Sequence, residues 1–137
     1  MLELLPEYLN KIANNLIVIS SLLSGFSIAV MANLLVNKSD NRILNNILKV
    51  TTIAAASFLV TVFAMTKILM MTTEGYPLEI TQNDLTLPKL TGFLSFFLGI
   101  ISLSILIALS GWTKSRRIGI FTTIIGILTF LMIIINL

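Results

Sequence analysis

The chain has 137 residues, of which 56% are hydrophobic and 11% are charged, and its mean hydropathy is +1.00. Soluble domains carry about 25% charged residues, and a domain of about 150 residues still leaves roughly a third of its surface in water. The composition therefore excludes an ordinary soluble fold and indicates a protein that lies in lipid. The net charge of +3 is too small for a nucleic-acid-binding face.

The residue types also exclude most enzyme chemistry. The sequence contains no cysteine and no histidine, so disulfides, Cys/His metal sites and the Ser-His-Asp and Cys-His catalytic sets are absent. It also shows no paired carboxylates on one helix, no glycine-rich phosphate loop and no HExxH motif. We therefore expect a non-catalytic protein that binds no cofactor and no metal.

Four long apolar runs predict four membrane-spanning helices. At 1.5 Å per residue, each run is long enough to cross a hydrocarbon core of about 30 Å. The expected fold class is an all-α integral membrane protein, a single domain of four transmembrane helices in a bundle with short loops. Glu3 and Glu7 precede the first run and argue against a cleaved signal peptide. The runs cover residues 12–37, 50–71, 90–113 and 118–137.

The connection at residues 72–89 is the only one long enough for structure of its own. Apolar and polar residues alternate over 78–81 and over 85–87, and Pro77 and Pro88 bracket this stretch. The pattern predicts either a small hairpin or an irregular loop lying on the bundle, because two strands alone are only marginally stable.

The distribution of charge predicts the orientation in the cell membrane. Six of the nine basic residues lie in or beside the connections 38–49 and 114–117, whereas five of the six acids lie on the other side. By the positive-inside rule, these two loops are cytoplasmic and both termini are outside. The second loop is foremost a topology determinant, and the alternative role is binding of an anionic lipid headgroup. The six basic residues are Lys38, Arg42, Lys49, Lys114, Arg116 and Arg117.

Small and weakly polar residues form a stripe along each predicted helix. In lipid, such residues permit the close approach of helices and hydrogen bonds between them. In one interpretation all four stripes turn inward and pack one tight bundle; in the other, the stripe of the first helix faces an oligomer axis and lines a pore. The stripes are Ser21, Gly25, Ala29 and Asn33 in the first helix; Ala54, Ser57, Thr61 and Ala64 in the second; Gly92, Ser95, Gly99 and Ser102 in the third; and Gly119, Thr122, Gly126 and Thr129 in the fourth.

Lys67 is the one ionisable residue inside a predicted span. A charge in the membrane is costly, so it is a functional candidate by default, with a role in gating or in an ion path. Because Lys67 lies about one turn from the end of its span, the alternative is that its side chain reaches the interface, where Glu74 or a headgroup phosphate neutralises it.

The segment Ser21-Leu22-Leu23-Ser24-Gly25-Phe26 resembles the first membrane helix of the Orai calcium-channel family, which also has four spans. The resemblance covers about one helix and implies a pore-lining first helix, with Gly25 at the hinge position and Phe26 at the hydrophobic gate. The chain departs from the family pattern at Ala29, where the family has a valine, and at Asn33, where it has the selectivity glutamate. The family's termini are also cytoplasmic, opposite to the orientation that the charges predict here.

These patterns favour an oligomeric channel or pore-forming subunit that changes ion permeability. The alternative is a non-catalytic accessory or assembly subunit of a larger membrane complex. The expected partners are the lipid bilayer and either further copies of the chain or another membrane protein.

Overall fold

The computed structural model describes residues 5–36 and 41–137, except for the side chain of Gln82. Within these residues the chain forms four α-helices and one short 3-10 helix: α1 (Pro6–Val36), α2 (Arg42–Met71), α3 (Gln82–Ser110), η1 (Gly111–Thr113) and α4 (Arg116–Asn136). Each α-helix is long and apolar enough to cross a membrane, which confirms the predicted all-α fold class. The chain is therefore a small multi-pass membrane protein.

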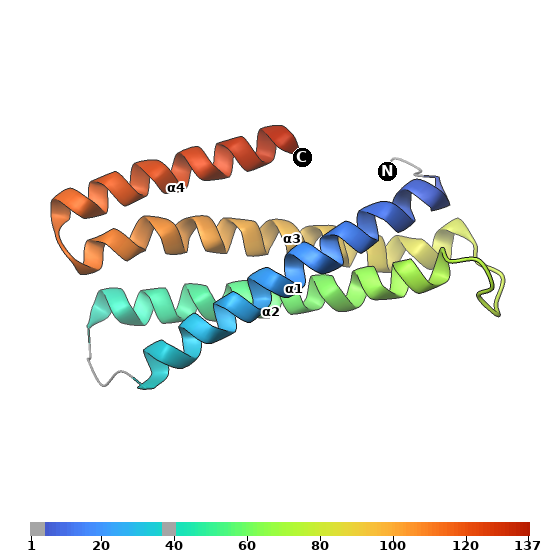
Figure 1. Ribbon diagram of the computed structural model, residues 1–137, viewed down its shortest axis with the longest axis horizontal. Coiled ribbons are helices and arrows are strands. Elements are labelled where there is room, and N and C mark those ends of the chain that lie inside the picture. Colours follow the sequence, from blue (N-terminus) through green and yellow to red (C-terminus); the bar gives the residue numbers. More distant parts are fainter. Residues whose placement is uncertain (1–4, 37–40) are drawn as a thin grey trace.

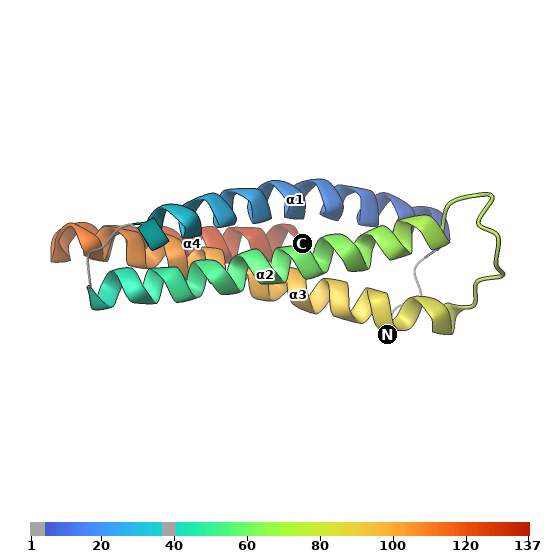
Figure 2. The ribbon, with the colours of Figure 1, turned by 90° about the horizontal axis from the view of Figure 1, so that it is seen from below.

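The four helices run antiparallel to their neighbours along the chain (Figure 1). In the described residues, α1 packs on α2, α2 on α3, and α3 on α4, and no other pair of α-helices packs extensively. In the half of the bundle nearer the α2–α3 loop, the turned view in Figure 2 shows α2 between α1 and α3. The outer helices, α1 and α4, consequently keep much of their surface free for lipid or for other proteins.

Three of the predicted small-residue stripes form the contacts inside this bundle. Gly99 lies so close to α2 that an added Cβ would be 2.7 Å from the ring of Phe58, and Gly126 so close to α3 that a Cβ would be 2.8 Å from the Ser104 carbonyl oxygen. The Thr61 hydroxyl donates to the carbonyl oxygens of Ser57, at 2.9 Å, and of Gly92, at 3.4 Å. The prediction that these stripes turn inward is confirmed, since every member of the three is buried or half-buried.

The connection between α2 and α3 contains no strand in the structure, so the hairpin alternative is wrong and the irregular loop is confirmed for residues 73–80. α3 begins earlier than the sequence pattern indicated because a capping box forms at its start. The carboxylate of Asp84 accepts hydrogen bonds from the backbone N–H and the hydroxyl of Thr81, at 2.9 and 3.0 Å. Pro88 then lies inside the helix and does not end it.

The two ends of the bundle differ in charge. The start of α2 and the α3–α4 connection lie at one end, and the α2–α3 loop lies at the other (Figure 1). Lys38 and Asp40, from the first predicted cytoplasmic loop, are outside the described residues. The described charges at the first end are all basic, namely Arg42, Lys49, Lys114, Arg116 and Arg117, whereas Glu7, Glu74, Glu79, Asp84, Lys11, Lys67 and Lys89 lie toward the other.

Candidate functional site on the exposed face of helix α1

Helix α1 contacts α2 through a seam of serines. Ser20, Ser24 and Ser27 are at most 2% exposed. The Ser24 hydroxyl donates to the carbonyl oxygen of Ala55 at 3.3 Å, while the hydroxyls of Ser20 and Ser27 are buried without a hydrogen-bond partner. The small side chains let the two helices approach closely, and two of the three hydroxyls gain no hydrogen bond from that approach.

Further polar contacts fix α1 near both of its ends. At its start, the Asn10 amide donates to the Leu69 carbonyl oxygen at 3.2 Å and to the Thr72 hydroxyl at 2.9 Å. Toward its other end, the Thr52 hydroxyl donates to the sulfur of Met31 at 3.3 Å. These contacts fix the rotation of α1 on α2, and they determine which of its faces points away from the bundle.

The predicted stripe of α1 points away from the bundle. Ser21, Gly25, Ala29 and Asn33 are all exposed, as is Phe26 at 62%. A Cβ added at Gly25 would meet nothing within 4 Å. The interpretation in which this stripe packs inside the bundle is therefore wrong, whereas its role as the lining of a pore stays a prediction.

The error has a geometric cause. The buried serines and the predicted stripe are offset by one residue, which is about 100° of rotation around the helix. Both faces are small enough for close packing, so the spacing of small residues alone did not distinguish them. The spacing of the buried residues indicates the buried face, because positions spaced by four and three residues form one seam of a left-handed bundle. The buried residues follow one another by four, three, four, four and three positions and are Leu9, Ala13, Leu16, Ser20, Ser24 and Ser27.

The structure shows that the buried lysine is Lys89 and not Lys67. Lys67 is exposed, and its charge acts on the nearby carboxylate of Asp84. Lys89, which the sequence placed at the end of a loop, lies within α3 and is only 6% exposed. No acceptor in the described part of the chain bonds to its ammonium group. The sequence did not single out Lys89 because the early start of α3 was not predicted.

The remaining candidate residues lie at the basic end. Lys114, Arg116 and Arg117 are exposed where the chain turns from η1 into α4. The Ser115 hydroxyl accepts a hydrogen bond from the Ile118 backbone N–H at 3.2 Å and so caps α4. In residues 5–36 and 41–137, no group of three acidic side chains is placed to bind a metal ion.

Comparisons with protein-family models, with curated proteins and with solved structures found no match for this chain. The fold itself defines the class, a small membrane protein of four antiparallel helices. The candidate site is the exposed small-residue face of α1, defined by Ser21, Gly25, Ala29 and Asn33.

Proposed function

We propose that the chain is a non-catalytic subunit of a homo-oligomeric pore, in which the exposed small-residue face of α1 surrounds the axis. The observation that supports this proposal is the contrast between the four stripes. Those of α2, α3 and α4 pack against other helices of the described chain, whereas the stripe of α1 has no helix against it. A small-residue face permits helices to approach closely, so several copies of α1 can assemble around one axis.

The chemistry of this face determines what such a pore would select. It presents the hydroxyl of Ser21, the amide of Asn33 and Gly25, which has no side chain. No acidic residue occurs between positions 12 and 36. Without a ring of charge, permeation depends on the width of the pore and on its wetting. The resemblance of residues 21–26 to the Orai family agrees with this proposal and assigns the hydrophobic constriction to Phe26. Because Asn33 replaces the family's glutamate, we expect no calcium filter.

Reconstituted liposomes test the pore directly. We expect the purified chain to conduct ions, Gly25→Leu to reduce the conductance at least tenfold by narrowing the axis, and Asn33→Asp to raise cation preference by adding a ring of charge. Ala56→Leu, at an exposed position on α2, is the matched control and should conduct as the unchanged chain does. Bilayers that remain silent over a range of voltages would refute the pore.

The alternative function uses the same exposed face. An accessory subunit would bind its α1 face to a helix of a larger membrane protein, and the chain alone would then be monomeric and silent in bilayers. The two functions are separated by the mass of the particle in mild detergent together with the conductance. A conducting homo-oligomer supports the pore, and a silent monomer that purifies with a stoichiometric partner supports the accessory subunit.

We further propose that the basic end of the bundle is cytoplasmic in the cell membrane, with both termini outside. Of the six acids in the sequence, Asp40 is the one near the basic residues of this end, and this excess of cations is the asymmetry that the positive-inside rule uses. Because the sequence contains no cysteine, single-cysteine variants report the orientation without background. A cysteine at Ser115 should react with a membrane-impermeant thiol reagent only after cells are permeabilised, and a cysteine at Gly75 should react in intact cells. The reverse pattern would overturn this orientation.

A further inference from the structure

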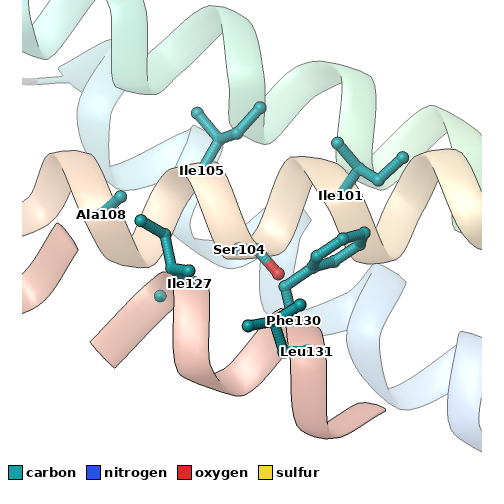
Figure 3. Close-up of a pocket in the computed structure, with 8 residues that line it drawn as sticks. Ile101, Ser104, Ile105, Ala108, Ile127, Phe130 and Leu131 are labelled. Carbon is teal, nitrogen blue, oxygen red and sulfur yellow. The ribbon is translucent and has the colours of Figure 1, made fainter. Parts of the chain in front are cut away.

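A narrow groove runs along the outer face of the contact between α3 and α4. Figure 3 shows side chains from α3 on one side of it and side chains from α4 on the other. The groove exists because Ser104, Ala108 and Gly126 are small, whereas the flanking residues are large. It has a volume of about 220 Å³. The large flanking residues are Ile101, Ile105, Ile127, Phe130 and Leu131.

The groove provides no free polar group to a ligand. The one side-chain hydroxyl in its lining, that of Ser104, donates to the Ile100 carbonyl oxygen at 3.0 Å. Pockets for compact small molecules hold about 300–1,000 Å³ and place several polar groups around the ligand. A smaller and almost entirely apolar groove that opens on the lipid-facing side of two helices fits a thin hydrocarbon chain.

Cations lie beyond this groove, at the basic end of the bundle. Arg116 precedes Ile127 by eleven residues of the same helix, so the two share one face of α4 and are separated by about 16 Å along its axis. That length is close to half of a hydrocarbon core of about 30 Å, which is the depth that one leaflet's acyl chains span. Lys114 and Arg117 add two exposed cations beside Arg116.

Trp112 lies between the cations and the groove. Its indole N–H donates to the Thr123 hydroxyl at 2.9 Å, and that hydroxyl bonds to the carbonyl oxygens of Gly119 and Ala108. The ring also lies against Gly119, where it leaves no room for an added Cβ. Tryptophan is enriched at the headgroup level of membranes.

We propose that the α3–α4 groove and the cations of Lys114, Arg116 and Arg117 form one binding site for an acidic glycerophospholipid. The cations hold the phosphate headgroup, and one acyl chain descends past Trp112 into the groove between Ile105 and Ile127. The charge of the headgroup is complementary to the three cations, and the depth of the groove matches the length of the chain. This site is independent of the α1 face and does not depend on the proposed pore.

Native mass spectrometry of the whole chain tests the headgroup half of the site, with dioleoyl phosphatidylglycerol and dioleoyl phosphatidylcholine offered in equal amounts. We expect the unchanged protein to retain phosphatidylglycerol. Replacing any one of the three cations by glutamine should weaken this retention about fivefold. The matched control is the double variant Arg42→Gln/Lys49→Gln, at the same end of the bundle but on α2, which should retain the lipid. Equal retention of the two lipids by the unchanged protein, or an equal loss in the control, would refute the site.

The groove half is tested with Ala108→Leu, which places a larger side chain in the groove, against Ala56→Leu on an exposed face of α2. We expect Ala108→Leu to reduce bound phosphatidylglycerol about tenfold, and Ala56→Leu to leave it unchanged, while both variants keep the helical circular dichroism of the parent. Unchanged lipid binding by Ala108→Leu overturns the groove. Disulfide-linked dimers of Ile127→Cys also overturn it, because a second copy would then occupy the groove.

Discussion

Gly126→Val is expected to detach α4 from α3. The Cβ of the new residue would lie 2.8 Å from the Ser104 carbonyl oxygen and 3.3 Å from the Ala108 backbone nitrogen. Both are backbone atoms of α3, so they cannot rotate away as a side chain does, and the helices must separate. Separation also breaks the hydrogen bond from the Thr122 hydroxyl to the Ala108 carbonyl oxygen, now 3.0 Å. We expect a loss of about 1–3 kcal/mol in the free energy of unfolding.

Gly25→Val is the matched control for this effect. Both glycines lie inside long apolar helices, so the change in helix propensity is the same, but a Cβ at Gly25 meets nothing within 4 Å. Unfolding of each variant in mixed micelles with increasing dodecyl sulfate measures the difference. A cysteine pair at Ala108 and Thr122 reports the detachment of α4, because its disulfide should form readily in the parent and poorly with Gly126→Val. If the two variants lose the same stability, Gly126 is not needed for the close approach of α4 to α3.

The small-residue stripes show how far the sequence determines the packing. In α3 and α4, glycines seven residues apart lie among large apolar residues, so one face alone permits close approach and the sequence identifies it. In α1, two small faces lie side by side, and the presence of small residues alone does not distinguish them, although the spacing of the buried face by four and three residues does. The hydrogen bonds of Asn10 to Leu69 and Thr72 cross about sixty residues of sequence, and no local pattern predicts such a pairing.

The start of α3 shows a different limit. Alternation over 78–81 and 85–87 suggested strands, and Pro88 suggested a boundary, yet Thr81 and Asp84 form a capping box that begins a helix. The helix then continues through Pro88 because buried residues at a spacing of four and three, Leu85, Lys89 and Gly92, pack its inner face. The capped helix is more stable than the hairpin that the alternation indicated, because two strands alone are only marginally stable. The burial of Lys89 is a consequence of this start.

Lys89→Met is expected to stabilise the chain. The side chain of Lys89 is only 6% exposed, and its ammonium group bonds to no acceptor among the described residues, Gln82 set aside. An unsatisfied buried polar group costs about 1–3 kcal/mol, and more when it is charged. The ammonium group of Lys89 is not fully enclosed, unlike the hydroxyls of Ser20 and Ser27. Its remaining exposure reduces the free-energy cost of burying the charge. Because methionine has a similar length and no charge, we expect a gain of about 1 kcal/mol in the free energy of unfolding.

Lys67→Met is the matched control, because Lys67 lies at the same end of the bundle and is exposed. Its replacement removes an exposed charge near Asp84 and should change the free energy of unfolding by less than about 0.5 kcal/mol. Both variants are measured by dodecyl sulfate titration in the same micelles. We expect Lys89→Met to be the most stable, and the parent and Lys67→Met to be equally stable. A loss of stability in Lys89→Met would mean that its ammonium group binds an acceptor beyond the described residues, either in another part of the chain or from outside it.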